Sequence, residues 1–126
     1  SYLPWNRGAD PNFWSFMDKT PQGVTIHYLD DGIDTGDIIV QKKVKFLDGE
    51  DTLSKTYWRL QQEIQALFKQ HWQDIKLGQC QRFRQAHRGT FHAAKEKEII
   101  FQQLSQGWNT RLDELRNHAA AGRELS

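Results

Sequence analysis

The chain has 126 residues, enough for a single modest hydrophobic core. Its 17 basic and 16 acidic residues nearly cancel, which removes the main electrostatic argument for binding DNA or an anionic membrane. The single cysteine excludes an intramolecular disulfide and a multi-cysteine zinc site, and it fits a reducing compartment. No apolar run approaches the roughly 20 residues that a membrane-spanning helix needs. We therefore expect a cytoplasmic protein with one domain or part of one.

The first segment, residues 1–12, holds two of the three prolines and shows no periodicity, so we expect a loop. Asn12 is then a candidate cap for a short helix, FWSFMDK, whose aromatic residues fall at spacings that place them on one face. Pro21 and Gly23 would end this helix. The chain opens on SYLPWN without an initiator methionine, which we interpret as a start inside a larger folded protein.

Two strands and a polar loop follow. Residues 23–29, GVTIHYL, alternate in the manner of a β-strand, and residues 38–46, IIVQKKVKF, alternate in the same way. The segment between them, DDGIDTGD, has two glycines and four aspartates in eight positions, a composition typical of a tight turn. We predict that the two strands form a β-hairpin.

The rest of the sequence favours helices. Apolar residues recur at three- and four-residue steps over residues 52–77, with Asp51 or Thr52 as the cap and Gly78 as the end. Residues 79–92 have no clear period and are expected to form a connection, and shorter helices are expected over 96–106 and 110–121. The predicted fold class is α/β: a β-hairpin at the edge of a sheet, packed by a long helix and followed by further helices.

The aspartate-rich loop is the densest cluster of reactive groups. A carboxylate crowded by like charges or partly buried can have its pKa raised, and it can then move protons near neutral pH. Composition alone leaves a second interpretation open, an ordinary hairpin loop that uses aspartate for turn formation and solubility. A calcium loop would need an acidic spacing that ends in glutamate, which is absent, so we expect no metal site.

The strings SYLPWNRGADPNFW and GVTIHYLDDGIDTGDIIVQ, in this order, resemble the folate-dependent formyltransferase family. This family includes methionyl-tRNA formyltransferase, glycinamide ribonucleotide transformylase and the sugar N-formyltransferases. The resemblance is close over residues 1–46 and loose over the long helix. It implies that residues 1–126 are the C-terminal portion of a Rossmann-like catalytic domain whose N-terminal nucleotide-fold half is absent from the sequence.

The resemblance also implies roles. The family transfers a formyl group from 10-formyl-tetrahydrofolate to an amine with an Asn, a His and an Asp, and the Asp matches Asp34, which would position a water and relay the proton that leaves the amine. Thr25 and His27 would support the site, although a strand histidine without any role remains an alternative for His27. Two further groups are expected to bind ligands. The residues expected to line the pterin pocket are Leu29, Asp30, Asp31, Gly32 and Ile33, and those expected to contact the acceptor are Leu3, Pro4, Arg7 and Gly8.

The family's Asn and His would precede Ser1 and are not in this sequence, so we expect the 126 residues alone to be inactive. The expected acceptor is a small amine on a nucleotide-linked amino sugar, because helical patterns follow the core where the tRNA enzyme has a β-rich domain. Glycinamide ribonucleotide, methionyl-tRNA and a non-catalytic binding or assembly module that keeps the loop are the alternatives. The exposed sheet edge leads us to expect a homodimer or a strand-exchanged dimer.

Overall fold

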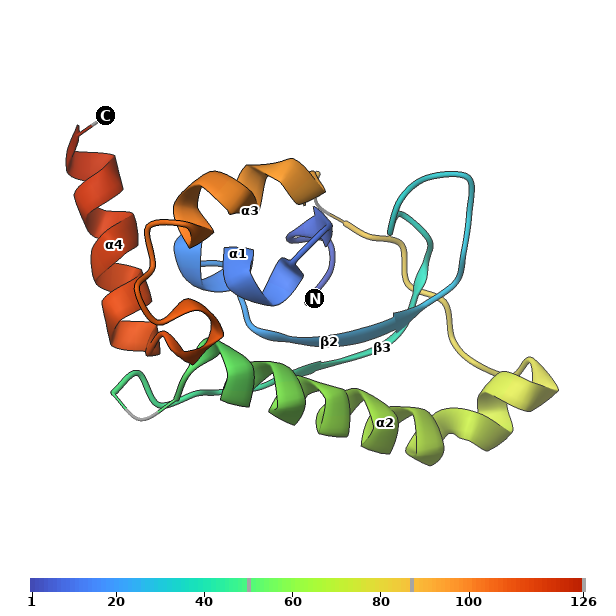
Figure 1. The fold of residues 1–126 in the computed structure, drawn as a ribbon. Helices are drawn as coiled ribbons and strands as arrows, with labels where there is room; N and C mark the ends of the chain where they lie inside the picture. The colour runs from blue at the N-terminus through green and yellow to red at the C-terminus, as the bar shows by residue number, and fades with distance from the viewer. Residues whose placement is uncertain (50, 87, 126) are drawn as a thin grey trace.

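A computed structural model describes residues 1–49, 51–86 and 88–125 of the chain. The architecture is mixed α/β, as predicted (Figure 1). None of the helices in these ranges is long and apolar enough to cross a membrane. The elements, in chain order, are β1 (Arg7–Gly8), α1 (Pro11–Met17), β2 (Gly23–His27), β3 (Ile38–Lys43), α2 (Leu53–Leu77), β4 (Phe91–His92), α3 (Ala94–Phe101), the 3₁₀ turn η1 (Gly107–Asn109) and α4 (Leu112–Leu125).

The predicted hairpin is confirmed. β2 and β3 pair antiparallel, with Ile26 opposite Val40 and an irregularity in register between Ile26 and His27. Both strands end earlier than predicted, but Tyr28 N donates to Asp37 O at 2.9 Å and so continues the pairing beyond β2. Alternation along the strands gives the hairpin one apolar face and one more polar face.

The long helix α2 covers the apolar face of this hairpin (Figure 1). Thr52 is its cap, with a side-chain oxygen that accepts a hydrogen bond from Lys55 N, and Gly78 ends the helix in a left-handed conformation at φ 67°. The predicted helix and both of its ends are therefore confirmed. The buried residues shared by hairpin and helix are Val24, Val44, Leu60 and Leu67.

A second core joins the other helices. In Figure 1, α1 and α3 lie on the side of the hairpin opposite α2, and α4 stands at one end. α1 contacts both α4 and the start of α2, because the aromatic face predicted for the segment after Asn12 is buried there. The buried members of this core are Phe13, Trp14, Phe16, Met17, Leu53, Leu104, Leu112, Leu115 and Ala119.

Some sequence-based boundaries are corrected. α1 begins at Pro11, so Asn12 lies inside the helix and does not cap it; its side-chain amide donates instead to Thr56 Oγ1 at 2.8 Å. The helix expected over 96–106 runs from Ala94 to Phe101, and the last helix, expected over 110–121, runs from Leu112 to Leu125.

The segments expected to be loop and connection contain a short parallel pairing. β1 pairs with β4, with Arg7 opposite Phe91 and Gly8 opposite His92. Two-residue strands are too short to show alternation in sequence, which is why the pattern did not reveal them. The pairing fixes the start of the chain beside residues 90–92.

Candidate functional site

Asp34 lies in the loop between β2 and β3 in a left-handed conformation, with φ 57°. This conformation disfavours most residues but is tolerated by aspartate. Its Oδ2 accepts a hydrogen bond from Gly8 N at 3.0 Å, and its Oδ1 lies 3.7 Å from His27 Nε2. The side chain is 36% exposed. The structure thus brings Asp34, His27 and Gly8 together, and leaves the carboxylate open to solvent on one side.

The donor to this carboxylate comes from β1. Arg7 N and Ala9 N donate to carbonyls of residues 90 and 92, so the amide between them, Gly8 N, points away from β4 and toward Asp34. Gly8 has φ 92°, and a Cβ at this position would collide with His92 O and the Phe91 ring. Only glycine therefore fits the site without strain.

His27 offers one nitrogen to Asp34. Its Nδ1 lies 2.8 Å from Tyr28 O, and because a carbonyl only accepts, Nδ1 carries the proton of that hydrogen bond. In the neutral ring Nε2 then has a lone pair facing Asp34, and attraction between the two side chains requires a protonated imidazole. While the imidazole is neutral, His27 therefore lies beside Asp34 without a hydrogen bond to its carboxylate.

Thr25 anchors the start of the chain to β2. Its hydroxyl donates to Ser1 O at 2.8 Å and accepts from Leu3 N at 3.2 Å. Gln41, on the paired strand β3, donates both to the Thr25 hydroxyl and to Leu3 O. Thr25 therefore holds residues 1–3 in place and does not itself contact Asp34 in any described hydrogen bond.

The loop of residues 29–33 projects outward. Leu29 is 92% exposed and Ile33 is 61% exposed. Asp30 Oδ1 accepts from Thr35 Oγ1 at 2.5 Å and from Gly32 N at 2.9 Å, and these hydrogen bonds lower the pKa of Asp30 below its ordinary value. The direction is opposite to the one that crowding among aspartates predicts. Asp31 is exposed. No described hydrogen bond or ion pair joins Leu29, Asp31 or Ile33 to the side chain of Asp34.

The residues expected to contact the acceptor fall into two groups. Leu3 and Pro4 are buried, so their side chains pack inside the fold. Arg7 is partly exposed, and its guanidinium donates to Gln85 Oε1 and to Arg88 O, which are both neutral acceptors. Its positive charge nevertheless acts at Asp30, where it contributes to the lowered pKa.

Sequence reasoning missed Gln85. It lies in the 79–92 connection, where no period or motif marks it, and its side chain joins Arg7 to the backbone of the Asp34 loop. No sequence signal could have found it, because its partners are 51 and 78 positions away.

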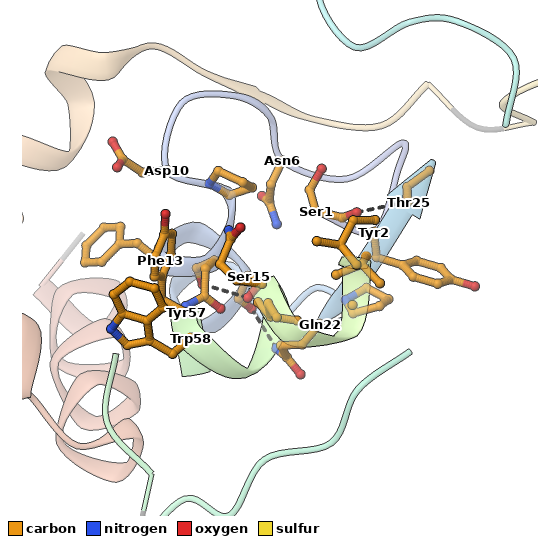
Figure 2. Close-up of a pocket in the computed structure, with 18 of the residues that line it drawn as sticks. Ser1, Tyr2, Asn6, Asp10, Phe13, Ser15, Gln22, Thr25, Tyr57 and Trp58 are labelled. Carbon is orange, nitrogen blue, oxygen red and sulfur yellow. Dashed lines mark hydrogen bonds between the residues drawn. The ribbon is translucent and has the colours of Figure 1, made fainter. Parts of the chain in front are cut away.

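A cavity of about 670 Å³ lies elsewhere, between α1, β2 and α2. Figure 2 shows Tyr57 and Trp58 beside Phe13, and Ser1 hydrogen-bonded to Thr25. Asn12 also lines the cavity, and its Oδ1 is buried without a hydrogen-bond partner. Asp34 and His27 do not line it, so the cavity and the candidate acid–base site are separate features.

Within the described ranges, no group of three or more His, Cys, Asp or Glu side chains is placed to hold a metal ion.

A partly exposed carboxylate, fixed by a backbone amide on a glycine-bearing loop of an α/β fold, defines a site suited to proton transfer. The chain matches the family model described as formyl transferase over residues 1–71, more than half its length, and it belongs to that family.

Relatives and solved structures agree with this family. The dTDP-4-amino-4,6-dideoxyglucose formyltransferase of Mycobacterium bovis is 33% identical over 99 residues, which cover 79% of this chain. A methionyl-tRNA formyltransferase of Lachnospira eligens is 44% identical over 61 residues, 48% of this chain and 19% of that protein. The crystal structure of the formyltransferase PseJ from Anoxybacillus kamchatkensis, in complex with UDP-4,6-dideoxy-4-formamido-L-AltNAc and tetrahydrofolate, matches 94% of this chain at 49% identity and a TM-score of 0.89.

The chain is shorter than these proteins. It spans 42% of the length of the mycobacterial relative and 62% of the PseJ chain.

Proposed function

We propose that this chain is part of an enzyme that transfers a formyl group from 10-formyl-tetrahydrofolate to the primary amine of a nucleotide-linked amino sugar. The observation that carries the proposal is the Asp34 carboxylate, held by Gly8 N inside the motif that resembles the family's catalytic loop. The similarity to PseJ, whose structure contains a UDP-linked formamido sugar, and to a dTDP-amino-sugar formyltransferase supports this class of acceptor.

Asp34 would take the proton that leaves the acceptor amine, directly or through one water. Gly8 N occupies Oδ2, so Oδ1 and the solvent-exposed side of the carboxylate remain free to accept that proton. Once Asp34 has taken up the proton, its carboxyl group would face the lone pair of His27 Nε2, which lies 3.7 Å from Oδ1. The amine nitrogen would lose this proton as it bonds to the formyl carbon. The bond between that carbon and N10 of the folate would then break, and N10 would take up a proton as tetrahydrofolate leaves.

The loop of residues 29–33 has the features that a flat folate ring requires. Leu29 and Ile33 present large apolar side chains to solvent, and Gly32 lets the backbone approach a ring closely. Asp30 is committed to Thr35 and Gly32, so it would shape the loop, while Asp31 is free to contact the ligand. When bound, 10-formyl-tetrahydrofolate supplies the formyl group.

Arg7 would bind a phosphate of the nucleotide. Its acceptors are an amide oxygen and a carbonyl, neither of which carries a charge. A diphosphate would supply the anion that a guanidinium prefers. Gly8 would face the acceptor through its backbone, and the buried Leu3 and Pro4 would hold the segment in shape.

We propose further that residues 1–126 act as the C-terminal portion of a longer catalytic domain, whose other part supplies the family's Asn and His. The greater length of the relatives supports this organisation, and so does the cavity beside β2, lined by Val24, Leu60 and Ile64, which offers an apolar surface to further structure. The exposed aromatic residues of α2, Trp58, Phe68 and Trp72, support the proposal of a homodimer.

Methionyl-tRNA is the second candidate acceptor. The observation in its favour is the 44% identity to the Lachnospira eligens enzyme over 61 residues. The near-zero net charge of this chain gives no electrostatic support for binding a polyanion, which ranks the tRNA below the sugar.

The test is a formyl-transfer assay on the full-length protein. The enzyme is incubated with 10-formyl-tetrahydrofolate and UDP- or dTDP-linked 4-amino sugars, and mass spectrometry measures the formamido product. We expect product only with the amino sugar, and none with a sugar that has a hydroxyl in place of the amine. Formylation of methionyl-tRNA and of no amino sugar would identify methionyl-tRNA as the acceptor. Absence of product with every amine would contradict the proposed formyl transfer. Residues 1–126 alone are expected to yield no product.

A further inference from the structure

The side chain of Gln85 joins the two segments that build the candidate site. Its Oε1 accepts from Arg7 Nε at 3.2 Å and from Arg7 Nη2 at 2.5 Å. Its Nε2 donates to Asp34 O at 2.9 Å and to Gly36 O at 2.7 Å. The amide therefore uses both of its donor hydrogens on one segment and accepts two hydrogen bonds from the other.

The partners fix the orientation of this amide. A flipped side chain would place the NH₂ group against guanidinium donors and the oxygen against two carbonyls, so every contact would become repulsive. Among natural side chains, only an amide supplies an acceptor and a double donor within this reach.

Asp34 benefits from such support because its backbone lies in the left-handed region, which glycine adopts freely and aspartate only tolerates. The carbonyl of Asp34 is one of the two oxygens that Gln85 binds. Arg7, the other partner of Gln85, directly precedes Gly8, the donor to the Asp34 carboxylate. Gln85 thus connects the backbone that carries Asp34 with the backbone that orients its side chain.

The segment that carries Gln85 is itself fixed to the hairpin. Phe83 N and O exchange hydrogen bonds with Ile38, at 2.9 and 2.7 Å. Arg82 pairs with Asp37 at 3.3 Å and lies over the Tyr28 ring at 3.9 Å. Gln85 therefore approaches Asp34 from a backbone that is already docked beside β3.

We propose that Gln85 is a positioning residue for Asp34: it sets the direction of the carboxylate without touching the substrates. This inference rests on the proposed function. Without Gln85 the carboxylate keeps its chemistry but loses its fixed direction. A misplacement of about 1 Å can cost on the order of a hundredfold in rate, so we expect kcat to fall about tenfold to a hundredfold.

Two variants of the full-length protein separate positioning from simple stabilisation. Gln85→Met keeps the length of the side chain and removes all four hydrogen bonds. Gln85→Glu keeps the acceptor that faces Arg7 and places an oxygen against the carbonyls of Asp34 and Gly36. The matched control is Gln81→Glu, because Gln81 is exposed on the same connection and has no described hydrogen bond.

Steady-state kinetics and thermal unfolding are measured for all three variants. We expect kcat to fall in both Gln85 variants, with the KM for 10-formyl-tetrahydrofolate and the melting temperature close to those of wild type and of Gln81→Glu. The KM for the nucleotide sugar is expected to change as well, because Gln85 holds Arg7, the proposed phosphate ligand. A Gln85→Glu enzyme with normal kcat would show that the bonds to Asp34 and Gly36 are dispensable and would overturn the proposal. A fall in kcat that follows a fall in melting temperature would overturn it as well.

Failure of the proposed function is recognised separately, because wild type then transfers no formyl group to any acceptor. Hydrogen exchange of the Gly8 amide, measured in the same proteins, decides the positioning role in that case. Faster exchange in Gln85→Met than in Gln81→Glu, at equal global stability, supports it. Equal exchange contradicts it.

Discussion

The loop of residues 29–37 and the core between α1 and α4 lie in one small molecule but are held by different interactions. The core is apolar and buried, with Phe13, Phe16 and Leu115 almost fully excluded from solvent. The loop is mostly exposed and is held by hydrogen bonds to Asp30, Asp34 and Gly36. Apolar burial stabilises without fixing direction, whereas hydrogen bonds fix direction at little net gain in stability. We therefore expect changes in the loop to affect activity, and changes in the core to affect folding.

The largest expected effect on activity is that of Asp34→Asn. The amide oxygen can still accept from Gly8 N, so the loop is retained, but an amide cannot take up a proton from the amine. We expect kcat of the full-length enzyme to fall about 10²- to 10⁴-fold, with the free energy of unfolding unchanged within about 0.5 kcal/mol. Asp74→Asn, an exposed aspartate on α2 outside the loop, serves as the control. Retention of the wild-type rate by Asp34→Asn would remove the proposed proton acceptor.

The largest expected effect on stability is that of Phe16→Ala in the core. Phe16 is fully buried against Phe46 and Arg116, so truncation leaves a cavity and should lower the free energy of unfolding by about 3–5 kcal/mol. Urea unfolding measures this change, and the exposed Ile99→Ala should have little effect. A large fall in kcat of the folded Phe16→Ala enzyme would contradict the expectation that changes in the core affect folding and changes in the loop affect activity.

Gly8→Ala, in the β1–β4 pairing, should lower both stability and activity. The new Cβ meets His92 O, and the residue must keep φ 92°, so we expect a loss of about 1–3 kcal/mol together with a displaced donor to Asp34. Circular dichroism and turnover are measured side by side. Gly49→Ala is the control, because a Cβ there meets no atom within 4 Å. Normal stability in Gly8→Ala would show that β1 and β4 can separate without loss.

The smallest expected effect concerns Asp30. Thr35→Val removes the hydroxyl that donates to its carboxylate, so the pKa of Asp30 should rise toward its ordinary value, while Thr35→Ser should keep it low. Because the folded pKa is lowered, these bonds contribute fully above about pH 4 and are lost as the pH falls through the folded pKa. A carboxyl NMR titration measures the shift, and equal Asp30 titration in both variants would contradict the assigned cause.

Local patterns predicted much of this fold. The alternation in GVTIHYL and IIVQKKVKF identified the hairpin, and Thr52 and Gly78 marked both ends of α2, because strand alternation and helix caps are written in neighbouring residues. Helix α1 was found as well, from its aromatic spacing, although its first turn was misplaced by the assignment of Asn12 as a cap.

Long-range polar contacts could not be predicted. The β1–β4 pairing joins residues more than 80 positions apart, and His92 stacks on Trp14 at 3.8 Å while its Nε2 lies 2.6 Å from Asp18 Oδ2. Neither arrangement has a periodic signal. For the site, the motif indicated Asp34 and His27, but the hydrogen bonds that Asp34 receives from Gly8 N and Gln85 depend on how distant segments meet.

Hydrogen exchange of the full-length protein with and without 5-formyl-tetrahydrofolate, a non-reactive folate, tests the central claim most directly. If the loop binds folate and the helical core supports it, added folate should slow exchange in residues 29–36 and at Gly8, and leave residues 112–121 unchanged. Slowed exchange confined to the helices, or unchanged exchange in the loop at saturating folate, would contradict the assignment of this loop as the folate site.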